Sequence, residues 1–202
     1  MGFTDNFGHP KGMLGRLMLV SMDKEHLPMA LWGFDQFDMP SKADILDIGC
    51  GGGYNIRRML SMCPEGRMIG YDISEESVRK ARKVNKGEKR VEIIKGSVAD
   101  MPFPNGTFDL VTAFETVFFW PDTEKNIKEV FRIVKPGGMF VVINNYGNAE
   151  IDWEKKVPCM KRYKAEQISE FMEAAGFLDV TVSKKDSYFC VTGKNTTGEQ
   201  SV

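Results

Sequence analysis

Short apolar runs alternate along this chain with longer segments in which apolar residues recur every three or four positions. The first pattern predicts buried strands, and the second predicts helices with one apolar face. From residue 43 onward the two kinds of segment alternate, which is typical of a parallel sheet with helices on both faces. Seven segments have strand character: ADILDIG, RMIGYDI, VEIIKG, FDLVTAF, GMFVVINN, LDVTVSKK and YFCVTGK.

The last two predicted strands are separated only by Asp186 and Ser187, so no helix can connect them. Such a short connection predicts an antiparallel hairpin at one edge of the sheet. We therefore expect an α/β fold of the Rossmann-like, doubly wound kind. Its seven-stranded sheet should be mostly parallel and should end in the C-terminal antiparallel hairpin.

The segment before Ala43 has a different character. The stretch GMLGRLMLVSMDKEHLPMALWGFDQF lacks the alternation of a strand and is rich in Met, Leu and aromatic residues. This pattern predicts one or two amphipathic helices packed over the functional edge of the sheet. The expected organisation is an N-terminal helical lid and substrate segment at 1–42, a ligand-binding domain at 43–194 and a polar tail at 195–202.

Composition and charge narrow the range of partners. The chain has 202 residues, with 27 Lys and Arg against 28 Asp and Glu, so no long-range attraction to nucleic acid is expected. The four cysteines form no C-x-x-C pair, which argues against a metal site or a disulfide framework. No apolar stretch has the length of a signal peptide or a membrane span, so we expect a cytoplasmic protein without membrane insertion.

The glycine-rich stretch ILDIGCGGGYN follows the first predicted strand, where nucleotide ligands commonly bind. A P-loop requires a Lys followed by Ser or Thr, whereas Tyr54, Asn55 and Ile56 follow the glycines here. The dinucleotide motif G-x-G-x-x-G places Tyr54 or Ile56 at its third glycine, where a bulky side chain obstructs a pyrophosphate. Nicotinamide nucleotides are therefore disfavoured.

A ligand that carries ribose but no phosphate is still expected. Asp72 follows the second strand about 20 residues beyond the loop, where a carboxylate can accept hydrogen bonds from ribose hydroxyls. Asp47 directly precedes the glycines and can hold an amino group. The pattern favours an adenosine-containing ligand.

Four ordered segments, LDIGCGGGY, YDIS, GSVADMPFPNGTFDLV and VFRIVKPGGMFVVIN, resemble the successive motifs of class I S-adenosylmethionine-dependent methyltransferases. They lie between Ala43 and Asn144, and the C-terminal hairpin also fits that family. The nearest group is the small-molecule type that includes ubiquinone, menaquinone and sterol C-methyltransferases. The resemblance implies S-adenosyl-L-methionine as cofactor and methyl transfer to a small-molecule acceptor by in-line displacement.

The resemblance also implies roles for individual residues. The glycines of the loop would let the backbone approach the methionine part of the cofactor, and Asp72 would bind the ribose. The family often has an Asp after the glycine of its third strand, but this chain has Ser97 there, so the adenine contact falls to Ser97 and Val98. The expected cofactor-binding residues are Asp47, Gly49, Cys50, Gly51, Asp72, Ile73, Ser97, Val98, Phe114 and Glu115.

Candidate catalytic residues are fewer. His26 lies in the lid segment and has an unperturbed pKa near neutral, Glu115 follows the fourth strand, and Tyr146 follows the fifth. The acceptor pocket is expected to include His9, Trp32, Phe119, Trp120 and Asn144. A monomer or homodimer is expected, and the alternatives are a noncatalytic sensor of an adenosyl ligand or a methyltransferase that acts on a macromolecule.

Overall fold

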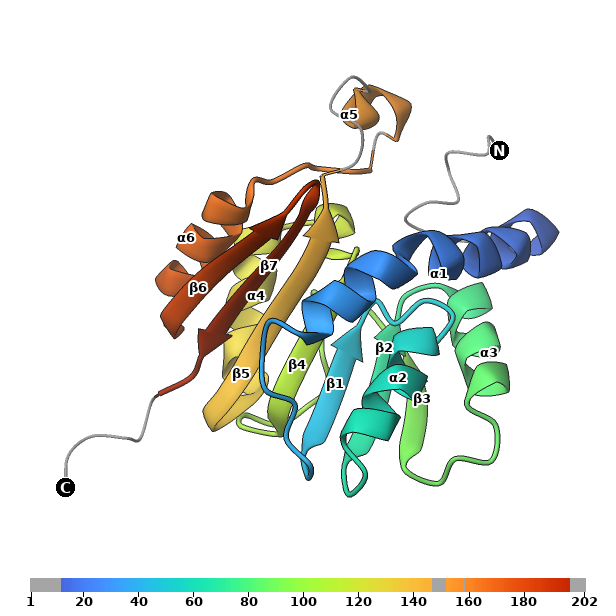
Figure 1. Ribbon diagram of the computed structural model, residues 1–202, viewed down its shortest axis with the longest axis horizontal. Helices are drawn as coiled ribbons and strands as arrows, with labels where there is room; N and C mark the ends of the chain where they lie inside the picture. Colours follow the sequence, from blue (N-terminus) through green and yellow to red (C-terminus); the bar gives the residue numbers. More distant parts are fainter. Residues whose placement is uncertain (1–11, 147–151, 158, 197–202) are drawn as a thin grey trace.

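The computed structural model describes residues 12–146, 152–157 and 159–196, and a seven-stranded sheet forms its centre (Figure 1). The strand order is β3-β2-β1-β4-β5-β7-β6. The Rossmann-like α/β fold expected from the sequence is confirmed. The strands are β1 (Asp44–Ile48), β2 (Arg67–Asp72), β3 (Val91–Lys95), β4 (Phe108–Phe114), β5 (Val134–Asn145), β6 (Leu178–Lys185) and β7 (Tyr188–Lys194).

The first five strands are parallel to one another. Among the described strands, β7 has the opposite direction to the rest and is antiparallel to both of its neighbours, β5 and β6. The two-residue connection at Asp186 and Ser187 forms the predicted antiparallel hairpin, with Asp186 at a φ of 53°. The strand order reverses between β1 and β4, because the chain adds β2 and β3 on one side of β1 and the later strands on the other. Ligands of doubly wound sheets bind at such a reversal.

Helices cover both faces of the sheet (Figure 1). Buried residues of α1, α2 and α3 pack on one face, and those of α4 and α6 pack on the other. Strand side chains alternate between the two layers, so Ile45 and Leu46 belong to different clusters. The helices are α1 (Gly12–Phe34), α2 (Tyr54–Met62), α3 (Glu75–Val84), η2 (Val117–Phe119, a 3-10 helix), α4 (Thr123–Ile133), α5 (Trp153–Lys156) and α6 (Ala165–Ala175).

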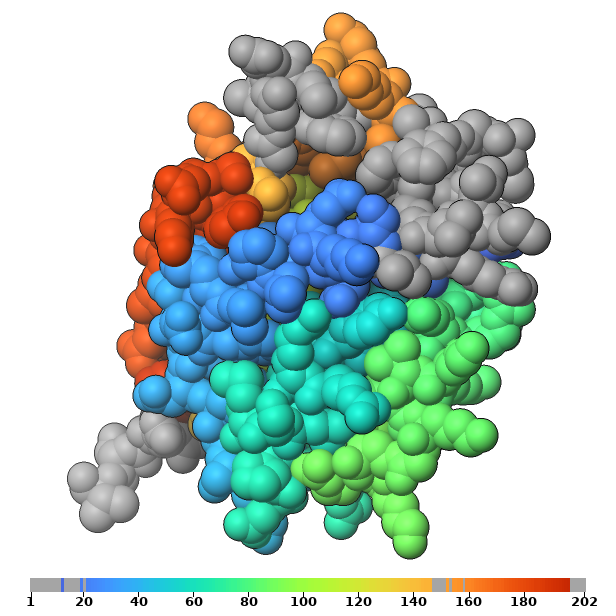
Figure 2. Space-filling model, turned by 45° about the vertical axis from the view of Figure 1, so that its right-hand side comes forward, coloured from blue at the N-terminus to red at the C-terminus, as the bar shows by residue number. Residues whose placement is uncertain are grey.

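Within the described part of the lid segment, Gly12–Phe34 form one continuous helix, α1, that contains Pro28. It crosses the front of the sheet near the carboxyl ends of the strands, and it packs against α3, β5 and β7 (Figure 1). In the space-filling view its atoms adjoin those of α2 and α3 (Figure 2). Gly33 lies so close to the sheet that an added Cβ would meet Ile143 at 2.6 Å. Apolar residues are not confined to the buried face, since Leu31 is 53% exposed.

Asn195, at the start of the predicted polar tail, is 4% exposed. Its side-chain amide donates to the carbonyl of Val134 at 2.8 Å, and its backbone N–H donates to Gly138 at 2.9 Å. These bonds occur where the pairing of β4 with β5 shifts register, around the Pro136–Gly138 segment of β5. No helix among the described residues is long and apolar enough to cross a membrane.

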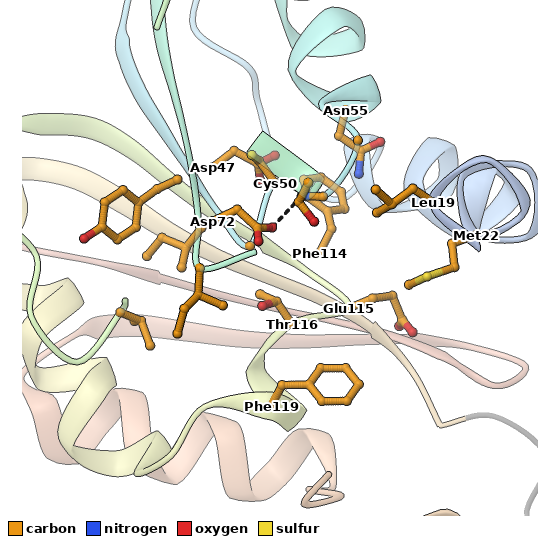
Figure 3. A pocket seen from close by; sticks show the side chains of 18 of the residues that line it. Leu19, Met22, Asp47, Cys50, Asn55, Asp72, Phe114, Glu115, Thr116 and Phe119 are labelled. Carbon is orange, nitrogen blue, oxygen red and sulfur yellow. Dashed lines mark hydrogen bonds between the residues drawn. The ribbon is translucent and has the colours of Figure 1, made fainter. Parts of the chain in front are cut away.

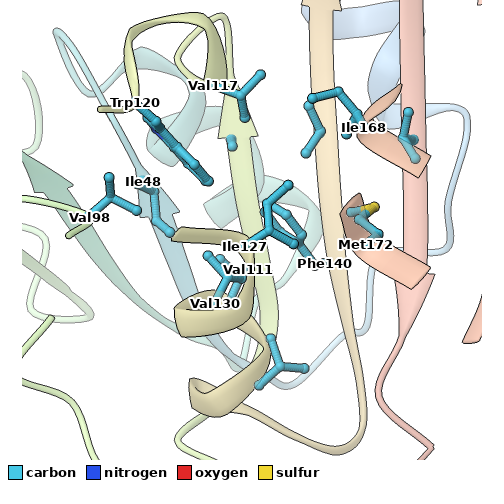
Figure 4. Close-up of a cluster of buried hydrophobic side chains, with 14 of the residues drawn as sticks. Ile48, Val98, Val111, Val117, Trp120, Ile127, Val130, Phe140, Ile168 and Met172 are labelled. Atoms are coloured by element: carbon cyan, nitrogen blue, oxygen red, sulfur yellow. The ribbon is translucent and has the colours of Figure 1, made fainter. Parts of the chain in front are cut away.

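The cluster between the sheet and α4 and α6 includes many aromatic side chains. Figure 4 shows two of them, Trp120 and Phe140, among aliphatic neighbours. Phe140 of β5 is fully buried at the centre of the cluster. Its ring stacks on Trp120 with a centroid distance of 6.4 Å and lies 5.8 Å from the ring of Phe177. These contacts fix β5 to the segment that follows η2. That segment forms one wall of the site described below.

We expect Phe140→Ala to lower the free energy of unfolding by about 3 to 5 kcal/mol, because it leaves a cavity between two aromatic rings. Urea denaturation measures this loss. The control is Leu178→Ala at a side chain that is 57% exposed, where the loss should stay below about 1 kcal/mol. Equal losses in the two variants would contradict this description of the core.

Candidate functional site

A cavity of about 320 Å³ lies at the reversal of strand order, between the carboxyl ends of β1, β2 and β4 and the helix α1 (Figure 3). The glycine-rich loop after β1 forms its floor, and residues of α1 and η2 form the opposite wall. In Figure 3, Asp47 and Asp72 lie toward one end of the cavity, and Met22, Glu115 and Phe119 lie toward the other. The two ends differ in chemistry.

Asp72 is held by backbone groups at the end of β2. The N–H of Gly51 donates to one carboxylate oxygen at 2.9 Å, and the N–H of Ser74 donates to the other at 2.8 Å. Ser74 also caps α3, because its hydroxyl accepts the N–H of Ser77. The carboxylate therefore joins the glycine loop to the start of α3 and has a fixed orientation at the cavity wall.

Asp47 is 2% exposed and lies beneath the glycine loop. The hydroxyl of Thr112 on β4 donates to its Oδ1 at 2.8 Å. Burial raises the pKa of Asp47 to about 7, the Thr112 hydrogen bond acts against this rise, and the nearby Asp72 adds to it. A buried carboxyl of this kind is prepared to receive a cationic or hydrogen-bond-donating group.

The glycine loop is packed too closely for side chains at two positions. Gly49 has a φ of 69°, and a Cβ there would lie 2.1 Å from the hydroxyl oxygen of Thr116. Gly53 has a φ of 75°, and a Cβ there would lie 2.8 Å from the Cβ of Ala81 on α3. The side chain of Asn85 also donates to the carbonyl of Gly53 at 3.0 Å. The loop is thus held between α3 and the segment after β4.

Beyond Asp72, the cavity wall continues to Ile73, Ser97 and Val98. Ile73 is 44% exposed, so a large apolar side chain stands at the open side of the cavity. The hydroxyl of Ser97 accepts the N–H of Ala99 at 3.3 Å. Asp100 is exposed and does not line the cavity. An apolar ring that lies on Ile73 would find polar groups only at the Ser97 side.

Glu115 occupies the other end and adopts an unusual backbone conformation, with a φ of 55°. Its carboxylate accepts the N–H of Asn145, and its own N–H donates to the carbonyl of Ile143 at 2.9 Å. Burial raises the pKa of Glu115 to about 8, and the hydrogen bond from Asn145 acts in the opposite direction. Strained backbone at a cavity wall is a feature of functional positions.

His26 of α1 faces this carboxylate, with 3.9 Å between its Nε2 and Oε2 of Glu115. Burial lowers the pKa of His26, while Glu25 and Asp23 act to raise it. A neutral imidazole and a carboxyl of raised pKa therefore face each other across the cavity at neutral pH. Either group can accept or pass on a proton near neutrality.

Apart from His26 and Asp23, the residues of α1 that line the cavity are apolar. Leu19, Met22, His26 and Met29 line the cavity at intervals of three and four residues, which places them on one side of the helix. Phe119 of η2 contributes a further apolar surface (Figure 3). The arrangement provides an apolar space with one polar pair at its wall.

An ion pair joins α1 to α2 at the edge of the cavity. Arg58 donates to Asp23 at 2.8 Å and to the side chain of Asn55 at 2.8 Å. Both members of the pair are partly exposed, with 23% and 19% of their side-chain surfaces accessible. This contact fixes the middle of α1 against the helix that follows the glycine loop.

All ten residues expected to hold a cofactor line the cavity, as do His26, Phe119 and Trp120 from the other predicted groups. Trp120 is 4% exposed, so most of its ring belongs to the core. Trp32, Asn144 and Tyr146 do not line the cavity. His9 lies outside the described residues.

The three residues outside the cavity have other surroundings. The ring of Trp32 lies 6.2 Å from that of Tyr188. The hydroxyl of Tyr146 accepts the N–H of Ala165 at 2.7 Å, and its ring lies 4.7 Å from Phe189. Asn144 is fully buried, and its side chain makes no hydrogen bond within the part of the chain that the structure describes.

Sequence reasoning missed several contributors: Thr112, Thr116, Asn85, and the pair of Asp23 with Arg58. Thr112 was the one detectable signal, as the single polar residue inside the apolar run DLVTAF apart from its initial Asp. The other contacts join residues that are far apart in sequence and belong to no motif. No three His, Cys, Asp or Glu side chains among the described residues gather in an arrangement that could hold a metal ion.

Comparisons with known proteins agree with this geometry. Residues 46–142 match the family described as a methyltransferase domain. The chain is 29% identical over 177 residues to the uncharacterized methyltransferase YdaC of Bacillus subtilis, covering 86% of this chain and 94% of that protein. It is 32% identical over 138 residues to the demethylmenaquinone methyltransferase of Lactococcus lactis, covering 63% of this chain and 55% of that protein.

The chain thus spans nearly the whole of the first relative and about half of the second. Among solved structures, a SAM-dependent methyltransferase from Aquifex aeolicus superposes with a TM-score of 0.73 at 21% identity. The alignment covers 89% of this chain and 98% of that one. A likeness at this level of identity establishes the fold, including the mostly parallel seven-stranded sheet.

We expect Gly49→Ala to destabilise the protein more than Gly87→Ala, by about 1 to 3 kcal/mol, in thermal or urea unfolding. Both glycines have positive φ, so both variants carry backbone strain. At Gly49 the new Cβ would also meet Thr116, whereas at Gly87 no described atom lies within 4 Å. Equal destabilisation would show that the loop is not packed as described.

Proposed function

Since the chain belongs to the class I S-adenosylmethionine-dependent methyltransferases, we propose that its cavity holds S-adenosylmethionine along the ends of β1 and β2, with a small-molecule acceptor beneath α1. The observation that carries this proposal is the fixed carboxylate of Asp72 at the end of β2, beside the glycine loop. The cofactor supplies a methyl group that its sulfonium has already activated. The protein then has to bind the cofactor and the acceptor, orient them toward each other and exclude water.

The residues present fit such a cofactor. A carboxylate with fixed orientation, as in Asp72, suits the paired hydroxyls of a ribose. Gly51 lines the cavity, and the nearest described atom to a Cβ there would be Cδ2 of Leu19 at 3.9 Å, so a ligand can approach the loop backbone closely at this position. Ile73 offers an apolar surface to an adenine ring, and the Ser97 and Val98 segment offers polar backbone groups. Asp47 remains for the amino group of the methionine part.

The acceptor end is shaped for an apolar molecule. Leu19, Met22 and Phe119 provide the surface against which its body packs, and α1 excludes water from the reacting centre. Residues 1–42 accordingly serve as lid and acceptor-binding segment, while residues 43–194 hold the cofactor. The acceptor then presents its methyl-accepting atom near Glu115 and His26, which face each other at this end of the cavity.

Glu115 is the group proposed to take a proton from the acceptor. Its raised pKa makes it a stronger base when ionised than an ordinary carboxylate. His26, at 3.9 Å, can stabilise the ionised form or pass the proton to solvent. Tyr146 does not reach the cavity, and its hydroxyl accepts the N–H of Ala165 instead, so the catalytic proposal rests on Glu115 and His26.

We further propose that the protein acts in the cytoplasm as a monomer or homodimer and has no nucleic-acid partner. The net charge of −1 and the narrow apolar acceptor space support a small-molecule acceptor. A small acceptor also accords with the relative named as a demethylmenaquinone methyltransferase.

Two measurements test the proposal together. Titration calorimetry should detect binding of S-adenosylmethionine and of its demethylated product, with no binding of NAD at the same concentrations. Incubation with methyl-labelled cofactor and fractionated metabolites should then transfer label to a small apolar compound. Binding of NAD alone would refute the cofactor assignment, and binding of S-adenosylmethionine without transfer to any fraction would favour a noncatalytic sensor.

Asp72→Ala should weaken the affinity for S-adenosylmethionine by about 1 to 3 kcal/mol, because hydrogen bonds between ribose and a charged group are lost. The control is Asp100→Ala, which removes an exposed acid near the same end of the sheet without changing the cavity wall. Its affinity should equal that of the unaltered protein. Loss of affinity in the control alone would place the ribose or adenine contact at Asp100.

Glu115→Gln should lower the rate of methyl transfer by about 10²- to 10⁴-fold, the usual contribution of a general base. The unaltered enzyme should gain activity as pH rises toward about 8, since the carboxyl must be ionised to accept a proton and its pKa is about 8. The variant should lose this pH dependence and keep its cofactor affinity. A variant with unchanged rate and pH profile would show that Glu115 is not the base.

A further inference from the structure

Asp47 is the penultimate residue of β1, and β1 has a paired strand on each side. It pairs in register with Thr112 of β4 on one side and with Gly70 of β2 on the other. Gly70 has no side chain to offer, and a Cβ there would meet Ile56 at 2.5 Å. The Thr112 side chain is therefore the neighbour in the sheet that can hold the Asp47 carboxyl, and it does so through the 2.8 Å hydrogen bond.

We propose that Thr112 is a positioning residue, which holds the Asp47 carboxyl ionised and directed at the amino group of S-adenosylmethionine. This inference rests on the proposed function, since it takes Asp47 as the partner of that amino group. Thr112 itself is fully buried and does not line the cavity, so it acts on the ligand only through Asp47. Its expected role differs from that of a residue that contacts the cofactor.

The geometry around the hydroxyl supports this role. A threonine hydroxyl has one proton to donate. The oxygen of Thr112 lies 2.8 Å from Oδ1 of Asp47, against 3.5 Å from the carbonyl of Leu46 and 3.9 Å from the sulfur of Met59. The carboxylate is thus its closest acceptor. A hydrogen bond donated to the charged form of an acid favours that form.

The surroundings of Asp47 act mainly against the ionisation of its carboxyl. Burial raises its pKa, and Asp72 of β2 raises it further. The Cys50 thiol of the glycine loop is also buried, and burial raises its pKa, so the thiol stays neutral and does not stabilise a charge on Asp47. Thr112 is the group that lowers the pKa of Asp47.

The remaining charged groups of this cavity come from α1 and α2, and each has another partner. Arg58 of α2 donates to Asp23 of α1. His26 of α1 faces Glu115. In the protein without ligand, the Thr112 hydroxyl is therefore the main group that counteracts the effect of burial on the pKa of Asp47. A cationic amino group that arrives at Asp47 would find the carboxyl already oriented.

The test compares Thr112→Val, which has nearly the same shape without the hydroxyl, with Thr112→Ser, which keeps the hydroxyl. Calorimetry across about pH 6 to 9 measures the affinity for S-adenosylmethionine, and carboxyl NMR follows the titration of Asp47. Thr112→Val should raise the pKa of Asp47 and weaken binding at pH 7 by about ten-fold, the loss of one hydrogen bond to a charged group. The difference in affinity between Thr112→Val and the unaltered protein should shrink as pH rises above the pKa of Asp47, and Thr112→Ser should behave as the unaltered protein.

A second ligand separates positioning from general damage to the fold. Methylthioadenosine carries the adenosine and the sulfur but no amino group, so its affinity should be unchanged in Thr112→Val. Equal weakening for both ligands at every pH, or no change in the Asp47 titration, would overturn the inference. Failure of the unaltered protein to bind either ligand would instead overturn the proposed function.

Discussion

The chain reverses its direction of progress across the sheet between β1 and β4, and the cavity depends on that reversal. The loop after β1 turns toward one face, and the segment after β4 turns toward the other, so the two separate at the carboxyl edge. Gly49 and Thr116 meet there without space for a further side chain. This close contact fixes both the glycine loop, which we propose faces the methionine part of S-adenosylmethionine, and the backbone next to Glu115.

Each end of the cavity holds one buried carboxyl. The two carboxyls have similar pKa values and different hydrogen-bond partners. Asp47 has a pKa of about 7, and Glu115 has a pKa of about 8. Asp47 is held by a hydroxyl within the sheet, and Glu115 is held by a backbone N–H at the end of β5. The first therefore has little freedom to move with a ligand. The second extends from a strained residue and faces an imidazole on a separate helix.

Much of the fold could be predicted because its signals are local. The two-residue connection between β6 and β7, the cap at Ser74 and the glycine loop are each contained within a few residues. The partnership of Thr112 with Asp47 is different, since 65 residues separate them and the register of β1 against β4 depends on packing. The prediction that Trp32 lines the pocket rested only on its position in the lid segment. The last turns of α1 lie over β5 and β7, and the ring of Trp32 packs near that of Tyr188 there.

It is equally hard to predict from sequence which residues of a strand face the cavity and which face the opposite layer. Ile143 and Asn144 are neighbours in β5, and alternation sends them to opposite faces. Ile143 packs beneath Gly33 of α1. Asn144 lies on the other face, with Phe140 and Val142, and so is turned away from the cavity to which it was assigned.

Two of the contacts that attach the helix α1 to the body of the protein differ in strength. Near its end, Gly33 is packed against the sheet, and this contact cannot part without exposing core residues. Toward its start, the pair of Asp23 with Arg58 is partly exposed, and such pairs contribute about 1 kcal/mol or less. Pro28 lies between them and lacks the N–H that would bond to the preceding turn, so bending costs least there. Exchange of cofactor and product is therefore expected to proceed by hinging of the first half of α1, with the second half remaining part of the core.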